Sequence, residues 1–157
     1  MKIKQVAIGK TEEEYLREGI KEYETRIKRY VSFESILLPA IKVTSQMTAA
    51  VVKAKEAERL IKYISPSDFV VLLDEKGTEM RSVEYANFLG GKFNTSIKTL
   101  VFLIGGPYGV DEAIKKRTNF IFSMSKLTFS HQMIRLFFAE QLYRALTILR
   151  NESYHHE

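Results

Sequence analysis

The chain has no cysteine and no tryptophan among its 157 residues, and it has only three prolines. The absence of cysteine excludes a disulfide framework and a thiolate metal site, so nothing in the composition points to secretion. The longest apolar runs, residues 69–73 and 100–104, fall far short of the roughly 18 residues that span a bilayer. Lys2 and Lys4 interrupt the apolar N-terminus, which excludes a signal-peptide core. We therefore expect a cytoplasmic protein with no membrane partner.

A single domain is expected to span residues 1–157, because a chain of this length can bury one sizeable core but not two. We find no internal repeat, low-complexity segment or linker. Lys and Arg number 24 against 19 Asp and Glu, which gives a net charge of +5. This excess favours an anionic partner, although a solvated basic surface explains it equally well.

Short apolar segments alternate with segments of helical periodicity along the chain. We predict strands at residues 3–8, 33–38, 68–74, 99–106 and 119–124. We predict long helices at residues 12–30, 81–93 and 131–150. A further helix follows the polar segment 42–48 and runs through about residue 63, and a short helix follows Asp111, its expected N-cap. Thr11 is the expected N-cap of the first helix, with Glu14 completing a capping box. The alternation predicts an α/β fold with a mainly parallel sheet.

Two segments carry more apolar residues than a half-buried element needs. The run from Asp68 to Asp74 is almost continuously apolar, which suits a strand buried on both faces. The helix from His131 to Arg150 has apolar residues on more than one stripe, whereas a surface helix needs only one. Either this helix lies between two layers, or its second apolar face meets another subunit. We favour the subunit interface and expect a homodimer.

Three loops follow apolar strands and are expected to converge on one ligand site. They read LLDEKG at residues 72–77, IGGPYG at 104–109 and MSKLTF at 124–129. In an open α/β sheet, the loops beyond the carboxyl ends of neighbouring strands border one crevice. The glycines of IGGPYG lack the G-x-G-x-x-G spacing of a dinucleotide site, and taken alone the segment is as compatible with a tight turn. Together the three loops predict a small-molecule site.

The segments IGGPYG and SKLTFSHQMIRLFFAEQLYRA and the Tyr-His tail resemble the ribosomal RNA large subunit methyltransferase H family, and the resemblance covers essentially the whole chain. The resemblance implies the SPOUT fold, in which the C-terminal part of the sheet forms a trefoil knot, and it implies S-adenosylmethionine as methyl donor, without a metal. It further implies methylation of N3 of a pseudouridine at position 1915 of 23S rRNA. The cofactor-binding residues that it implies are Leu73, Gly105, Met124, Ser125, Lys126, Leu127, Thr128 and Phe129.

The same resemblance assigns catalytic residues near the C-terminus. His155 is a candidate proton acceptor or orienting group, because an ordinary histidine titrates near neutrality. Tyr154 could stack on the base or hydrogen-bond it. Arg135 matches a basic position of the family and is expected to face the RNA or the cofactor. Glu140 and Arg144 also match, although an i,i+4 pair of this kind is as often an ordinary contact of a helix surface.

The chain departs from the family pattern at two positions. Ser130 stands where the family often has proline, and this change is expected to matter little, because serine is acceptable at a helix N-terminus. His156 replaces a basic Arg or Lys, so substrate affinity is expected to depend more on pH. His131 is left open as a cap, an interface residue or a catalyst.

The chain carries no appended RNA-binding module, so other surfaces must contribute to substrate recognition. We expect a composite site in which the second subunit and the assembled ribosome supply contacts. The basic residues that could touch phosphates, or simply form a solvated helix face, are Lys2, Lys4, Lys21, Arg26, Lys28 and Arg29. Two alternatives remain: a SPOUT methyltransferase that acts on tRNA, and a non-catalytic RNA-binding protein of ribosome assembly.

Overall fold

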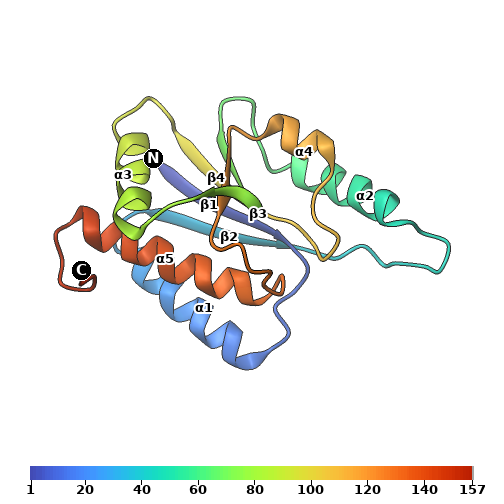
Figure 1. Cartoon of the computed structure of the whole chain (residues 1–157), viewed down its shortest axis with the longest axis horizontal. Helices are drawn as coiled ribbons and strands as arrows, with labels where there is room; N and C mark the ends of the chain where they lie inside the picture. The colour runs from blue at the N-terminus through green and yellow to red at the C-terminus, as the bar shows by residue number, and fades with distance from the viewer. Residues whose placement is uncertain (157) are drawn as a thin grey trace.

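The computed structural model describes residues 1–156, in which strands and helices alternate from one end to the other (Figure 1). The strands are β1 (Lys2–Ile8), β2 (Ser32–Leu38), β3 (Phe69–Glu79), β4 (Thr99–Ile104) and β5 (Phe120–Ser123). The helices are α1 (Glu14–Ile27), α2 (Ala49–Ile61), α3 (Ser82–Phe93), α4 (Glu112–Arg117) and α5 (Met133–Leu149). All the predicted elements are therefore present, with shifted boundaries.

The five strands form one sheet in the order β2-β1-β4-β3-β5, and every neighbouring pair is parallel. This confirms the predicted α/β class. Because all strands run in the same direction, their carboxyl ends lie along a single edge of the sheet. The loops that follow β3, β4 and β5 leave from neighbouring positions on that edge. The knot that the resemblance implies stays a prediction.

Helices cover both faces of the sheet, and each face buries its own apolar cluster (Figure 1). Successive residues of a strand point to opposite faces. In β3, Val71 packs with the cluster of α1, α3 and α5, whereas Val70 and Leu72 pack with the cluster of α2 and α4. All three side chains are fully buried. The prediction of a strand buried on both faces is confirmed.

The prediction of a loop at residues 72–77 is wrong, because strand β3 continues through these residues to Glu79. The pairing of β3 with β5 runs to Leu73, shifts its register, and resumes at Thr78. Gly77 explains why the chain can return to the sheet, since a Cβ at this position would lie 2.7 Å from the backbone carbonyl carbon of Ile121. Residues 74–77 are therefore a bulge within a strand, and bulges commonly lie next to sites because they redirect side chains.

The prediction that Thr11 caps the first helix is also wrong. Helix α1 begins at Glu14, its N-cap is Glu13, and no side chain caps it. Thr11 is buried instead, and its hydroxyl oxygen accepts a hydrogen bond from Arg135. The capping role of Asp111 is confirmed, since its carboxylate accepts from the backbone N–H of Ala113 at 2.8 Å.

Helix α5 packs between α1 and α3, which accounts for most of its apolar surface. Its buried residues are Arg135, Phe138, Ala139, Leu142, Ala145, Leu146 and Thr147. Phe137 is an exception, with 42% of its surface exposed. Helix α5 thus shares one helix layer with α1 and α3 on one face of the sheet and is not enclosed between two layers, and the homodimer stays a prediction. Within residues 1–156, no helix is long and apolar enough to cross a membrane.

Candidate functional site

A cavity of about 480 Å³ opens beside the bulge of β3 and beyond the ends of β4 and β5. The bulge, the turns after β4 and β5, and the start of α5 form most of its walls. Apolar side chains, backbone groups of the glycine turn, and a few polar and charged side chains line it together. Its volume lies within the range of about 300–1,000 Å³ that is usual for small-molecule sites. The three predicted segments do meet at one cavity, although the first of them is a bulge within β3 and not a loop after it.

The walls include seven of the eight residues expected to bind a cofactor, namely Leu73, Gly105, Met124, Ser125, Leu127, Thr128 and Phe129. Lys126 lies outside the cavity, and its ammonium group is 3.7 Å from the Glu79 carboxylate. Asp74, Glu75, Lys76 and Tyr108 belong to the segments that were expected to line the site, whereas Lys53, Lys115 and Ile134 were not foreseen. The site was predicted from loops that follow apolar strands, and that pattern does not indicate these residues.

Short hydrogen bonds shape the loop of residues 124–129. The Ser125 hydroxyl accepts from the backbone N–H of Leu127 at 3.0 Å, which closes a tight turn. The Thr128 hydroxyl then donates to the Glu75 carboxylate at 2.7 Å and ties this loop to the bulge of β3. Leu127, between these two anchors, is 74% exposed. An exposed apolar side chain beside a cavity is suited to pack against the face of a flat ring.

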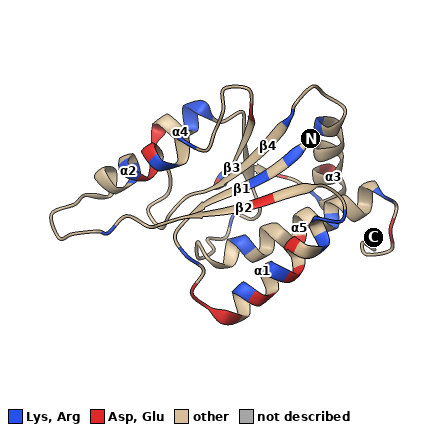
Figure 2. Cartoon of the chain, turned by 180° about the vertical axis from the view of Figure 1, so that it is seen from behind, with Lys and Arg blue, Asp and Glu red and all other residues tan. Residues whose placement is uncertain are grey.

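Charges of both signs surround the cavity. Asp74 and Glu75 from the β3 bulge provide carboxylates, and Lys53, Lys76 and Lys115 provide ammonium groups. The carboxylates suit a cationic ligand, whereas the lysines suit an anionic partner that approaches from outside. Figure 2 shows the basic residues of α2 and α4 on this part of the molecule.

Arg135 is fully buried in the protomer and does not line the cavity, so its expected contact with the RNA or the cofactor stays a prediction. Its guanidinium donates to the Thr11 hydroxyl at 3.0 Å and to the Ile8 carbonyl at 2.5 Å. Burial lowers the pKa of Arg135 to about 10, which still leaves it charged at neutral pH. No carboxylate among residues 1–156 forms an ion pair with it. The guanidinium therefore joins the end of β1 to α5 as a buried cation.

His131 lines the cavity one turn before Arg135. Burial, and secondarily the charge of Arg135, lower the pKa of His131. A ring with a lowered pKa is neutral at physiological pH and can accept or donate one hydrogen bond. The structure thus places His131 at the cavity, while the neighbouring Ser130 accepts from the backbone N–H of Met133 at 3.1 Å. This contact confirms that serine is acceptable there.

The C-terminal residues meet α5 and α1 in a compact polar group, which we call the tail cluster: Tyr23, Glu140, Arg144, Tyr154 and His155. Tyr154 donates to Glu140 at 3.0 Å, and its oxygen lies 3.3 Å from the Tyr23 hydroxyl. The Glu140 carboxylate also accepts from Arg144 at 2.6 Å. The Arg144 guanidinium lies over the Tyr154 ring, 4.7 Å from its centre, and 3.4 Å from Nδ1 of His155.

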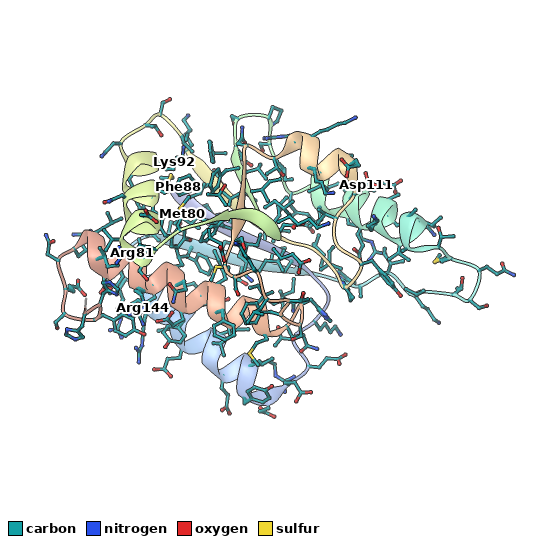
Figure 3. All side chains as sticks on the ribbon, in the orientation of Figure 1. Met80, Arg81, Phe88, Lys92, Asp111 and Arg144 are labelled. Carbon is teal, nitrogen blue, oxygen red and sulfur yellow. The ribbon has the colours of Figure 1, made fainter. Side chains whose placement is uncertain are left out.

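The contacts of the tail cluster give the Glu140–Arg144 ion pair a role beyond that of an ordinary helix contact. Taken alone, an i,i+4 pair is an ordinary helix contact, but this one is partly buried and holds two tail residues. Figure 3 labels Arg144, which lies near the end of α5 next to the tail. Burial, with the hydrogen bonds of Tyr23 and Glu140, raises the pKa of Tyr154, so its hydroxyl stays protonated. No sequence pattern pointed to Tyr23 as a member of this cluster.

The C-terminal tail lies beside the end of α5 (Figure 1), whereas the start of this helix borders the cavity. Ile134 borders the cavity, and Arg144 belongs to the tail cluster. Ten residues separate them, which corresponds to about 15 Å along a helix axis. The structure therefore brings the expected cofactor residues together, and it brings the tail residues together, but it does not join the two groups.

Two of the basic residues expected near phosphates already have acidic partners. Lys2 contacts Glu34 at 2.5 Å, and Arg26 pairs with Glu22 on the preceding turn of α1. Acidic and basic residues also alternate along α1 (Figure 2). These pairs favour the solvated-face interpretation for Lys2 and Arg26. In the part of the chain that the structure describes, no group of three or more His, Asp or Glu residues could hold a metal.

Comparison of the whole sequence with known families finds extensive similarity. A family model described as a predicted SPOUT methyltransferase matches residues 1–155. A relative from Parabacteroides distasonis, named ribosomal RNA large subunit methyltransferase H, is 50% identical over 157 residues and covers 100% of both chains. Relatives of the same name from Christiangramia forsetii and Bacteroides thetaiotaomicron are 48% and 47% identical, over 99% and 100% of each chain.

Solved structures share the arrangement of strands and helices at low sequence identity. A probable methyltransferase from Bordetella pertussis superimposes with a TM-score of 0.55 over 92% of this chain and 94% of that one, at 14% identity. A probable methylase family protein from Haemophilus influenzae gives a TM-score of 0.51 over 95% of this chain and 66% of that one, also at 14% identity. At such identities the likeness shows the fold alone.

Proposed function

Because the chain belongs to the ribosomal RNA large subunit methyltransferase H family of SPOUT methyltransferases, we propose that it methylates N3 of a pseudouridine, position 1915, in 23S rRNA of assembled ribosomes. The methyl donor is S-adenosylmethionine. The observation that carries this proposal is the cavity beyond β3, β4 and β5, whose walls include seven residues that match the cofactor segments of the family. A protein that acts on ribosomes in this way is cytoplasmic.

The cavity fits the chemistry of that cofactor. Its apolar side chains, Leu73, Met124 and Leu127 among them, suit a flat adenine ring, and its backbone groups suit the polar edge of the ring. The carboxylates of Asp74 and Glu75 suit a cationic sulfonium and an ammonium group. When bound, the cofactor supplies an electrophilic methyl group. The chain's own residues must hold it and align the base with it.

We further propose that the active site is shared between two protomers. Within one protomer, the tail cluster lies about 15 Å from the cavity along α5. A second copy that packs with its tail over this cavity brings the two groups into one site. Phe137 supports such packing, because it is exposed on α5 and its ring lies 4.8 Å from the Phe129 ring at the cavity wall. An exposed aromatic side chain of this kind is typical of interfaces.

In this composite site, Tyr154 and His155 orient the target base. The guanidinium of Arg144 can only donate hydrogen bonds, so Nδ1 of His155 accepts its contact at 3.4 Å. Because Nδ1 is held by Arg144, this geometry supports the orienting group over the proton acceptor among the two roles expected for His155. Tyr154, which stays protonated, offers its ring face for stacking.

A methylation assay tests the substrate. Ribosomes from a strain that lacks this modification are incubated with the protein and labelled S-adenosylmethionine, and free tRNA is treated in parallel. We expect label at one pseudouridine of 23S rRNA and none in tRNA. Label in tRNA alone would assign the chain to a SPOUT enzyme of different substrate.

Calorimetric titration with S-adenosylmethionine tests the enzyme assignment itself. We expect saturable binding with one site per protomer or per dimer. A complete absence of binding at high cofactor concentration would favour the alternative, a non-catalytic RNA-binding protein. Sedimentation analysis of the same samples measures the oligomeric state, and a monomer at all concentrations would contradict the shared site.

A further inference from the structure

Arg135 is a buried cation for which the fold provides no counter-charge. Its side chain is fully buried, no carboxylate among residues 1–156 forms an ion pair with it, and its Nε atom has no hydrogen-bond partner in that part of the chain. Its guanidinium donates only to neutral oxygens, those of Ile8 and Thr11. Taking a charge out of water without an opposite charge is costly, and groups of this kind cluster at functional sites. The charge therefore suits an anionic ligand group placed near it.

His131 lies beside this charge and borders the cavity. It is among the lining residues, whereas Arg135 is not. Both side chains pack against Gly9 at the end of β1: a Cβ built on this glycine would lie 3.6 Å from a guanidinium nitrogen of Arg135 and 3.8 Å from Nε2 of His131. Gly9 has a φ of 90°, which a residue with a side chain rarely adopts. The bend at Gly9 thus brings the guanidinium and the imidazole together at one wall.

The imidazole of His131 has an unused hydrogen-bond donor. Neither of its ring nitrogens has a hydrogen-bond partner among residues 1–156. Burial lowers the pKa of His131 and the charge of Arg135 acts in the same direction, so the ring is neutral at physiological pH. A neutral imidazole carries one N–H donor and one acceptor nitrogen. The wall at the start of α5 therefore combines a free donor with a buried positive charge beside it.

We propose that His131 binds the carboxylate of the methionine part of S-adenosylmethionine, and that Arg135 is a positioning residue that supports this wall and adds the attraction of its buried charge. This proposal deepens the proposed function and rests on it for the identity of the cofactor. The carboxylate is the only anionic group of that molecule, and a charge shielded from water attracts an anion more strongly than an exposed charge does. Asp74 and Glu75 of the β3 bulge remain for its cationic groups.

The lysines of the cavity are weaker candidates for this carboxylate. Lys76 and Lys115 are exposed, and Lys115 already pairs with Glu112 at 2.7 Å. Water and salt screen charges of this kind. Lys53 on α2 is half-buried and has no acidic partner among residues 1–156, so it is the rival that an experiment must separate from His131.

Decarboxylated S-adenosylmethionine isolates the carboxylate, because it keeps the adenosine, the sulfonium and the amine. In calorimetry, we expect the original protein to bind it about tenfold more weakly than S-adenosylmethionine, as for the loss of one charge-assisted hydrogen bond. In His131→Ala, the affinity for S-adenosylmethionine should fall about tenfold, while that for the decarboxylated compound stays within about twofold. Either His131→Asn or His131→Gln should restore most of the difference, because the amide N–H of one of them replaces the ring N–H that donates.

Removal of two cations tests the part of Arg135. Arg135→Gln removes the buried charge and should narrow the difference in affinity between the two compounds. Lys10→Gln removes an exposed charge next to Gly9, and as the matched control it should leave the difference unchanged. A merely structural role of Arg135 would weaken the binding of both compounds equally. Thermal unfolding shows whether Arg135→Gln is folded, and the His131 variants carry the test if it is not.

The remaining outcomes separate this proposal from the proposed function. The Cε1–H resonance of His131 should shift when S-adenosylmethionine is added, and much less with the decarboxylated compound. Equal binding of the two compounds by the original protein would overturn the proposal and leave the methyltransferase assignment intact. A difference that persists in His131→Ala but disappears in Lys53→Gln would also overturn it. Absence of binding of both compounds at high concentration would contradict the proposed function itself.

Discussion

The hydroxyl of Tyr154 donates a hydrogen bond to Glu140 at 3.0 Å and so attaches the end of the chain to the middle of α5. The same carboxylate oxygen accepts from Arg144 at 2.6 Å. One carboxylate thus sets the position of two side chains that are expected to meet the substrate. Its own side chain is only 17% exposed, so the contacts are partly shielded from water and salt.

Substitution of Glu140 should therefore uncouple the tail from α5. We expect Glu140→Ala to lower the methylation rate on ribosomes by about tenfold or more, because Tyr154 and Arg144 both lose an acceptor that keeps them in place. The affinity for S-adenosylmethionine, measured by calorimetry, should not change, because Glu140 does not line the cavity. Equal loss of cofactor binding would show that Glu140 acts on the cavity and not on the position of the tail.

Removal of the tail is a more drastic version of the same experiment. A chain that ends at Ser153 should lose methylation altogether while it keeps cofactor binding and dimer formation, because the tail adds little to the core. Sedimentation, calorimetry and the ribosome assay measure the three properties on one sample. Full turnover by the truncated protein would rule out a catalytic tail.

His131 should make stability depend on pH. Burial and the Arg135 charge lower its pKa below the ordinary 6.5, so the unfolded chain binds more protons than the folded one as pH falls from that value through the folded pKa. The free energy of unfolding should decrease across this window and change no further below it on account of this group. In His131→Gln, the decrease between about pH 7 and pH 5 should be smaller.

Urea denaturation at each pH measures this difference, and the NMR titration of the His131 ring measures the pKa directly. Tyr154→Phe is a suitable control, because it changes the tail without changing any group that titrates in this window. Identical pH slopes for His131→Gln and the original chain would contradict the lowered pKa.

Gly77 and Gly91 offer a matched pair of glycine substitutions. A Cβ on Gly77 would lie 2.7 Å from backbone atoms of Ile121, whereas a Cβ on Gly91 in α3 would meet nothing within 4 Å. We expect Gly77→Ala to lower the free energy of unfolding by about 2 kcal/mol or more, because it separates β3 from β5. Gly91→Ala should raise it by about 0.5–1 kcal/mol, since alanine favours the helix.

Thermal or urea unfolding of the two variants gives the comparison. Because Gly77 lies in the bulge next to Asp74 and Glu75, its substitution should also weaken cofactor binding. A Gly77→Ala protein of unchanged stability would mean that the two strands can separate without cost.

The order of elements could be predicted from the sequence because apolar runs and helical periods are local signals. The strand Phe69–Glu79 shows where such signals end. Its first half is apolar and was predicted, but its second half is polar and belongs to the sheet only because Gly77 lets it approach β5. Local periodicity cannot show a contact of this kind, which depends on a strand more than forty residues further along.

The candidate site, too, could be predicted only in part from the sequence. The loops could be placed at one edge of the sheet, and the resemblance supplied the residues of the wall. The burial of Arg135 was not foreseen, because its apolar neighbours on α5 read as a core stripe with one basic interruption. Its true partners, Thr11 and the Ile8 carbonyl, lie more than a hundred residues away in the chain.

The position of α5 has a consequence for how the chain acquires its structure. Phe138, Leu142 and Leu146 complete the apolar cluster that covers one whole face of the sheet, and they follow β1 by more than a hundred residues. The strands they cover are paired across long stretches of sequence, which makes folding slow and leaves apolar surface open in the meantime. The strands that are synthesised first therefore keep this face of the sheet uncovered until α5 has been made and packs on it.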